Sequence, residues 1–150
     1  MNELREIANH MLGVCLSKLV QIGLVSREQV NGRWHSRCDL DSRLEQLGFA
    51  AAASIDDNGN PVVIFSSKLN IQGLAHTLPH EAIHLAQICS GMYEPCSGYT
   101  VWSGEKYSNL AADDPNYFSP EHQPWEAQAH ELEPVVREAL LTQFPILRDV

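Results

Sequence analysis

The chain has 150 residues, of which 44 % are hydrophobic and 19 % charged, a composition typical of a soluble globular protein of single-domain length. Its formal net charge of −9, without a basic run, argues against nucleic acid or an anionic membrane surface as its main partner. We find neither an apolar run long enough for a membrane span nor a signal-like start. We therefore expect one cytoplasmic domain covering residues 1–150, and composition leaves its oligomeric state open.

The first part of the chain predicts helices separated by an irregular segment. Apolar residues recur every three or four positions over residues 3–24, which predicts an amphipathic helix ended by Gly23. Residues 26–39 are polar and contain a turn signal, so we expect no regular structure there. A short helix is expected over residues 39–47.

A β-hairpin is predicted next, over residues 49–55 and 62–67. The two segments flank Asn58-Gly59, a dipeptide typical of tight hairpin turns. A strand in this position either pairs through its free edge with an extended peptide or serves only as part of the sheet, and the sequence leaves both interpretations open.

The segment that follows carries the pattern His-Glu-x-x-His. In a helix over residues 79–90, His80 and His84 would lie one turn apart on one face, where their imidazoles can bind one Zn²⁺. Glu81 would then lie beside a water on the metal. Pro79 suits a first helical turn and Thr77 an N-cap, so we expect the helix to begin there. The alternative is an ordinary helix with polar residues on its exposed face.

The last third of the chain predicts a second hairpin, a loop and a final helix. Residues 99–107 read as a small hairpin, and the Asp-, Pro- and Asn-rich residues 110–123 as an exposed loop. A helix is expected from Pro124 to about Gln143, kinked or interrupted at Pro134.

A catalytic zinc usually has three protein ligands, so a third must come from elsewhere in the chain. Our choice is Glu126, a carboxylate beside Trp125 at the start of the last helix, where burial of a charge is explained by a metal. The alternative role for Glu126 is to complement the helix dipole. Rival third ligands are His122 and the pair Asp113 and Asp114.

His130 lies one turn after Glu126 and is our candidate for a further catalytic residue, either bonded to the Glu126 carboxylate or in contact with the reaction intermediate. His76 is expected to be a loop histidine. The four cysteines form no C-x-x-C pair, so we interpret them as reduced thiols, and Cys89 is only a minor candidate for a zinc ligand.

Three segments carry a resemblance to known proteins: His80–Gln87, the hairpin Trp102–Tyr107, and Pro124–Ala129. Together they resemble the zincin metallopeptidases in the gluzincin arrangement, and more narrowly the small His-Glu-x-x-His proteins of phages and environmental bacteria. The resemblance lies within residues 77–133. The longer metzincin motif, with a glycine and a third histidine, is absent from Ile88–Gly91.

The resemblance implies a zincin-like α+β fold, a small and mostly antiparallel sheet packed on helices, and peptide-bond hydrolysis. We expect Zn²⁺ on His80, His84 and Glu126, Glu81 as general base, and a peptide or protein as substrate. The oxyanion donor remains open among His122, His130 and the four tyrosines. Alternatives are a catalytically idle zinc-binding or peptide-binding domain, and a metallohydrolase of another substrate class.

Overall fold

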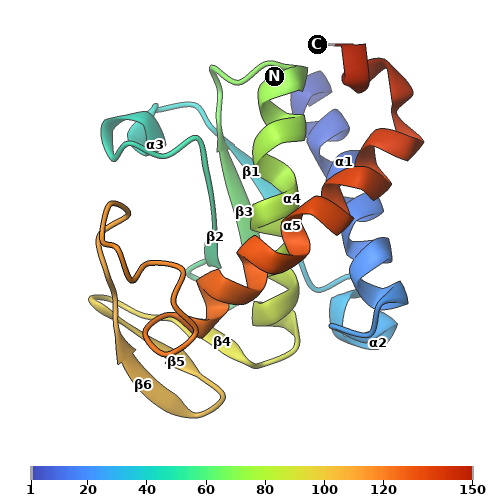
Figure 1. Cartoon of the computed structure of the whole chain (residues 1–150). Coiled ribbons are helices and arrows are strands. Elements are labelled where there is room, and N and C mark those ends of the chain that lie inside the picture. Colours follow the sequence, from blue (N-terminus) through green and yellow to red (C-terminus); the bar gives the residue numbers. More distant parts are fainter. Residues whose placement is uncertain (1, 150) are drawn as a thin grey trace.

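The computed structural model describes residues 2–149, and Figure 1 shows that they form an α+β fold. In chain order the elements are α1 (Asn2–Gln21), α2 (Arg27–Val30), β1 (His35–Asp39), α3 (Arg43–Gln46), β2 (Ala51–Ile55), β3 (Pro61–Ser66), α4 (Ile71–Cys89), β4 (Tyr93–Pro95), β5 (Tyr99–Trp102), β6 (Glu105–Ser108), α5 (Pro124–Gln143) and the 3-10 helix η1 (Pro145–Asp149).

The strands form two separate three-stranded sheets. Sheet A has the order β1-β3-β2, with β1 parallel and β2 antiparallel to the central strand β3. Sheet B has the order β4-β5-β6 and is antiparallel throughout. The expectation of a small sheet packed on helices is thus met at the level of the α+β class, but by two sheets, one of which is mixed.

The hydrophobic core lies between sheet A and the three long helices. α4 packs against α1, α5 and the strands β2 and β3, so it is the central helix of the molecule (Figure 1). Its residues Leu74, Leu78, Ala82, Ile83 and Leu85 are fully buried, as are Val63 and Phe65 of β3. α4 is therefore held in place on several sides, and this fixes the direction of every side chain that it carries.

The predicted hairpin is confirmed, because β2 and β3 pair around Asn58 and Gly59, and Gly59 adopts a φ of +82°. The second predicted hairpin is confirmed as β5 and β6. The prediction that residues 26–39 lack regular structure was wrong, since α2 and β1 both lie there. β1 has the polar sequence HSRCD, and it is a strand because it pairs with β3, which the local sequence does not reveal.

The predicted start of the central helix was also wrong. α4 begins at Ile71, and its N-cap is Asn70, whose side chain accepts a hydrogen bond of 2.8 Å from the Gly73 backbone N–H. Pro79 therefore lies inside the helix, and Thr77 is not a cap but donates to the Gly73 carbonyl oxygen. Gly73 is a weak helix former, and with Pro79 it made the first two turns look like a connection.

The other helix predictions differ mainly in their ends. α1 ends at Gln21, and Gly23 follows it with a φ of +85°. The short helix predicted over residues 39–47 is reduced to α3, because Asp39 belongs to β1. Pro134 does not interrupt α5, which continues to Gln143. Within residues 2–149, no helix combines the length and the apolar character needed to cross a membrane.

The cap at the start of α4 can be tested by substitution. Asn70→Ala removes the side chain that caps the N-terminus of this helix and should lower the free energy of unfolding by about 1 kcal/mol, or Tm by roughly 2–4 °C. Asn70→Asp retains the acceptor and should remain near the wild-type Tm in a thermal melt. Equal Tm values for the two variants would contradict the role of this cap.

Candidate metal centre

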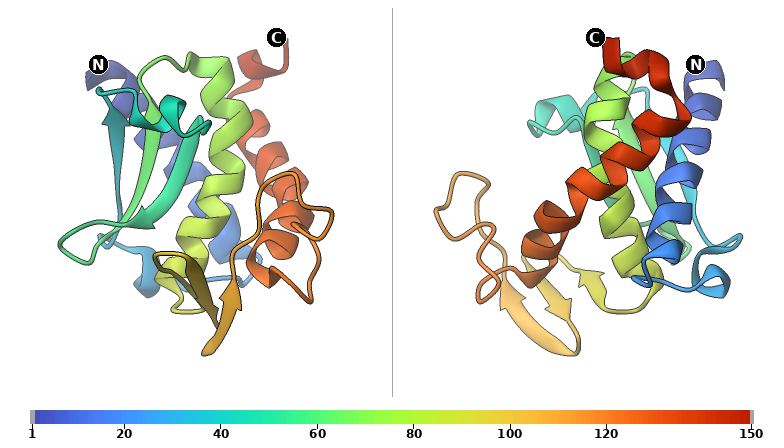
Figure 2. Two further views of the ribbon diagram at one scale, coloured as in Figure 1. Left: turned by 90° about the vertical axis from the view of Figure 1, so that its left-hand side faces the viewer. Right: turned by 45° about the vertical axis from the view of Figure 1, so that its right-hand side comes forward.

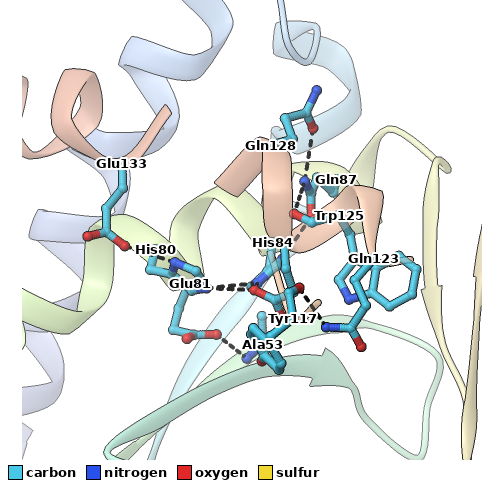
Figure 3. Close-up of polar contacts among 11 residues, drawn as sticks. Ala53, His80, Glu81, His84, Gln87, Tyr117, Gln123, Trp125, Gln128 and Glu133 are labelled. Atoms are coloured by element: carbon cyan, nitrogen blue, oxygen red, sulfur yellow. Dashed lines mark hydrogen bonds and ion pairs between the residues drawn. The ribbon is translucent and has the colours of Figure 1, made fainter. Parts of the chain in front are cut away.

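Three side-chain atoms from two helices meet at one point beside sheet A (Figure 3). His80 and His84 project from α4, and Glu126 from the first turn of α5. Glu126 Oε1 lies 3.0 Å from the Nε2 atom of each histidine, and the two Nε2 atoms lie 3.1 Å apart. The structure thus brings together the three residues that the sequence analysis selected as metal ligands.

The spacing of these atoms suits a small divalent cation. Ligand atoms that bind one tetrahedral Zn²⁺ at about 2.0–2.1 Å lie about 3.3 Å from one another. The three observed separations of 3.0, 3.0 and 3.1 Å are slightly shorter, so small side-chain movements would suffice to admit the ion. Two imidazoles and one carboxylate are a ligand set that catalytic zinc commonly has.

The outer nitrogen of each imidazole has its own acceptor. His80 Nδ1 lies 2.8 Å from Glu133 Oε1, and His84 Nδ1 lies 2.8 Å from Gln87 Oε1. Because both partners are oxygen acceptors, each Nδ1 carries the hydrogen. In the neutral rings each Nε2 atom then carries a lone pair, and these two atoms face each other and the Glu126 carboxylate. Three acceptors at this distance require a metal ion or shared protons between them.

Side chains behind the histidines hold these rings and join α4 to α5. Arg137 donates to Glu133 Oε2 at 2.9 Å and to the His76 carbonyl oxygen at 2.8 Å. Gln87, which is fully buried, donates from Nε2 to the carbonyl oxygen of Trp125 and to Gln128 Oε1. Each imidazole is therefore fixed in tautomer and orientation by a partner that is itself hydrogen-bonded.

The second oxygen of Glu126 is held by the loop that precedes α5. The Tyr117 hydroxyl donates to Glu126 Oε2 at 3.1 Å, which leaves Oε1 for the cluster. Gln123 is nearly fully buried and secures this loop, since it donates to the Tyr117 carbonyl oxygen and accepts from the Leu110 N–H. Residues 110–123 are thus tied to the carboxylate that completes the centre.

The electrostatics of the cluster without a metal reflect shared protons. Burial lowers the pKa of His80, but the hydrogen bond that His80 donates to the Glu126 carboxylate and the charges of the nearby carboxylates outweigh it and raise that pKa to about 9. The pKa of His84 is raised by the same carboxylate against the effect of burial. Burial raises the pKa of Glu126, but both histidines lower it far more, so the net shift is downward.

Glu81 lies next to the cluster and points toward the edge of sheet A (Figure 3). Its Oε1 accepts a hydrogen bond of 3.0 Å from the backbone N–H of Ala53 in β2. Burial raises the pKa of this carboxyl group, although both histidines act against that shift. Its Oε2 has no hydrogen-bond partner among residues 2–149 and can take a proton.

Tyr93 of β4 also lies beside the centre. Its ring centroid is 5.3 Å from that of His84, and it stacks on Trp125 at 6.0 Å. Burial, together with the charges of Glu126 and Glu81, raises the pKa of the Tyr93 hydroxyl. This hydroxyl therefore remains a neutral donor at ordinary pH.

The structure does not bring His130 into the cluster. Its side chain is exposed and packs against the Phe118 ring at 4.6 Å, and no hydrogen bond joins it to Glu126 within residues 2–149. Four residues along a helix add a rotation of about 40°, which directs His130 outward, whereas Ala129 takes the buried position. The predicted bond between His130 and Glu126 is therefore not formed.

The rival ligands also lie outside the cluster. His122 is exposed and bonds Ser119 Oγ, and Asp114 accepts from the Asn116 N–H. Asp113 and Cys89 are not among the residues that converge on the centre. His76 was expected in a loop but lies in α4, where it is exposed.

Sequence reasoning missed the residues that support the ligands: Glu133, Arg137 and Gln87. A signal was present, because Gln87 follows His84 by three residues and therefore lies on the same side of the helix. Glu133 follows Glu126 by seven residues, which leaves it only about 20° from that residue around the helix axis. Tyr117 gave no such signal, since its position depends on how the loop folds.

Comparison with known proteins adds no assignment: no family model matches the chain, and neither a curated protein nor a solved structure matches it.

The protons in the cluster predict a pH dependence that zinc should reverse. His80 has a raised pKa, so its contribution to the stability of the metal-free protein is complete below pH 6.5 and is lost as the pH rises through about 9. Zinc must displace these protons, so its apparent affinity should rise with pH, by about tenfold per unit for each proton displaced. Thermal melts with and without zinc between pH 6 and 9 measure both effects. A zinc-induced rise in Tm that does not increase with pH would contradict the shared protons.

The partner of His80 can be tested through zinc affinity. Glu133→Gln removes the charge that holds His80 Nδ1 and should weaken zinc binding about 10- to 100-fold, measured by competition with a chromophoric chelator. The matched control is Glu131→Gln, an exposed glutamate on the same helix, which should leave the affinity unchanged. Equal affinities for both variants would exclude a role of Glu133 in the centre.

Proposed function

We propose that this chain is a zinc-dependent metallopeptidase of zincin-like fold. His80, His84 and Glu126 would hold the metal, and Glu81 would act as general base. One observation carries the proposal: three acceptor atoms converge within 3.1 Å, each on a fixed side chain, and a further carboxylate lies beside them. A structural zinc would have a fourth protein ligand, and among residues 2–149 only three candidate ligands meet here.

The chemistry follows from the neighbours of the centre. Bound zinc would supply Lewis acidity, lowering the pKa of a water to about 7 and polarising a carbonyl group. Glu81 would take the proton of the attacking water on Oε2 while Oε1 remains on the Ala53 N–H, and would then pass that proton to the leaving amine. Tyr93, whose ring packs against His84, is the proposed donor for a developing oxyanion, because the Tyr117 hydroxyl already donates to Glu126 and both His122 and His130 are exposed.

A peptide is the substrate class that the surroundings favour. β2 is an edge strand of sheet A. The Ser66 N–H donates to the Ala50 carbonyl oxygen, and the Asp56 N–H donates to the Asn60 carbonyl oxygen, so the backbone groups of the even-numbered residues of β2 face β3. The backbone groups of its odd-numbered residues, including Ala51, therefore face outward beside Glu81. An extended peptide can bind such an edge through main-chain hydrogen bonds.

A pocket of about 270 Å³ lies directly beside this edge. Ala50 and Ala51 form one wall, His80, Glu81 and Glu133 form another, and Phe49 lies at its rim with half of its surface exposed. The small alanine side chains leave this space open next to the proposed reacting groups. We infer that it receives a substrate side chain adjacent to the scissile bond.

The base is tested by Glu81→Gln. The variant should retain about one zinc per chain, because Glu81 is not a ligand, yet lose at least 10³-fold in turnover of an internally quenched peptide library. The control is Glu94→Gln, an exposed glutamate of β4, which should keep wild-type turnover. Full turnover by Glu81→Gln would reject the assignment of the base.

The metal ligands are tested by Glu126→Ala. Protein purified without added metal or chelator should contain about one zinc per chain, and the variant should have lost most of it while retaining a cooperative thermal transition. Unchanged zinc content would reject Glu126 as ligand. Normal zinc content in the wild type, without hydrolysis of any peptide in the library, would favour the idle zinc-binding domain over the peptidase.

A further inference from the structure

A second hollow lies at the opposite edge of sheet A from the metal centre. It has a volume of about 690 Å³ and surrounds the end of β1, the outer strand next to β3. Arg5 of α1, Arg37 of β1 and Arg43 of α3 line it, together with Leu40 and Leu47. The left view of Figure 2 looks onto sheet A, with α3 at one end of its strands.

The three arginines are exposed. The chain has 19 acidic and only 10 basic residues, yet none of these three forms an ion pair with a described side chain of residues 2–149. Lys68, Arg137 and Arg148 do form such pairs. Three guanidinium groups around one hollow therefore give an anion a local binding surface on an otherwise acidic molecule.

Two aspartates also line this hollow, and one of them is already engaged. Asp39 accepts from the Asp41 N–H at 3.1 Å and from the Leu44 N–H at 2.6 Å, so both of its oxygens face the start of α3. Asp41 is exposed and opposes an incoming anion. The lining of the hollow thus carries three positive charges against two negative ones, a net formal charge of +1, and the carboxylate of Asp39 is directed toward the backbone N–H groups at the start of α3.

Exposed leucines accompany the positive charges. Leu40 is 67 % exposed and Leu47 70 % exposed, the largest exposed fractions among the apolar side chains that line the hollow. Neither is explained by packing in the core. A ligand that carries only charge would leave both side chains in water, whereas one with apolar groups beside its carboxylates would cover them.

We propose that this hollow binds an acidic peptide segment of a partner protein, in which carboxylates alternate with apolar residues. Arg37 and Arg43 take the carboxylates, and Leu40 and Leu47 contact the apolar side chains. β1 is an edge strand, so a peptide could bind beside it in an extended conformation. Successive side chains of such a peptide point to opposite faces, which is why we propose that carboxylates and apolar residues alternate in it. The proposal does not depend on the metal centre.

The test is binding of fluorescein-labelled hexapeptides measured by anisotropy at low salt. The protein is the full-length Glu81→Gln variant, so that hydrolysis does not consume the probe. A peptide alternating glutamate and leucine should bind, whereas peptides alternating lysine with leucine, or glutamate with serine, should bind at least tenfold more weakly. Binding should weaken as salt is added.

Variants locate the site. Arg37→Glu combined with Arg43→Glu should weaken binding of the glutamate–leucine peptide at least tenfold, Leu47→Ser should weaken it severalfold, and Asp41→Asn should strengthen it. Arg27→Glu combined with Arg33→Glu reverses two exposed arginines that do not line the hollow, is the control for the same change in net charge, and should change the affinity less than twofold.

Several outcomes would overturn the proposal. These are no binding up to 1 mM, equal binding of the lysine–leucine peptide, or tighter binding of an oligothymidine through the same arginines. Binding that is lost in Glu126→Ala but retained in the arginine variants would place the peptide at the metal centre instead, so the two sites are distinguished.

Discussion

The candidate site depends on one constraint: three acceptor atoms lie so close together that they need a proton or a cation between them. Nε2 of His80 and of His84 and Oε1 of Glu126 lie within 3.1 Å, and their helices come from distant parts of the chain. Such a contact forms only if packing elsewhere brings α4 and α5 together. The fully buried side chains of the core provide this packing, and the cluster then requires protons or a metal ion to be stable.

Hydrogen bonds to the Nδ1 atoms of the two histidines fix the orientation of the rings in the cluster. Glu133 and Gln87 hold the Nδ1 atoms of the two histidines, and each is secured in turn by a residue of α5. The His80–Glu133 and Gln87–Gln128 bonds therefore also join the two helices. A substitution in this layer would act on helix packing and on metal affinity together, so a readout of metal affinity at preserved stability is needed to separate the two effects.

The sequence was sufficient to predict the features that local chemistry determines. The helical spacing of His80 and His84 predicted their common face, and the buried setting of Glu126 predicted that its carboxylate joins them. Features set by tertiary contacts were missed. β1 has a polar sequence and is a strand only because it pairs with β3. Gly73 and Pro79 disfavour a helix in the local sequence, so the first turns of α4 were not predicted. For His130, a rotation of about 40° was enough to turn a candidate residue toward solvent.

The protonated cluster also bears on whether a metal would be a structural or a functional part of this protein. In small metal-stabilised domains the metal supplies most of the folding free energy, and the apo-protein is unfolded. Here the hydrophobic core extends over α1, α4, α5 and sheet A without a contribution from the cluster, whose ligands neutralise one another by sharing protons. We therefore expect the core to form without the ion. Under the proposed function, the core positions the three ligands that residues 2–149 bring together, and the fourth coordination position would remain for a water or a substrate carbonyl group.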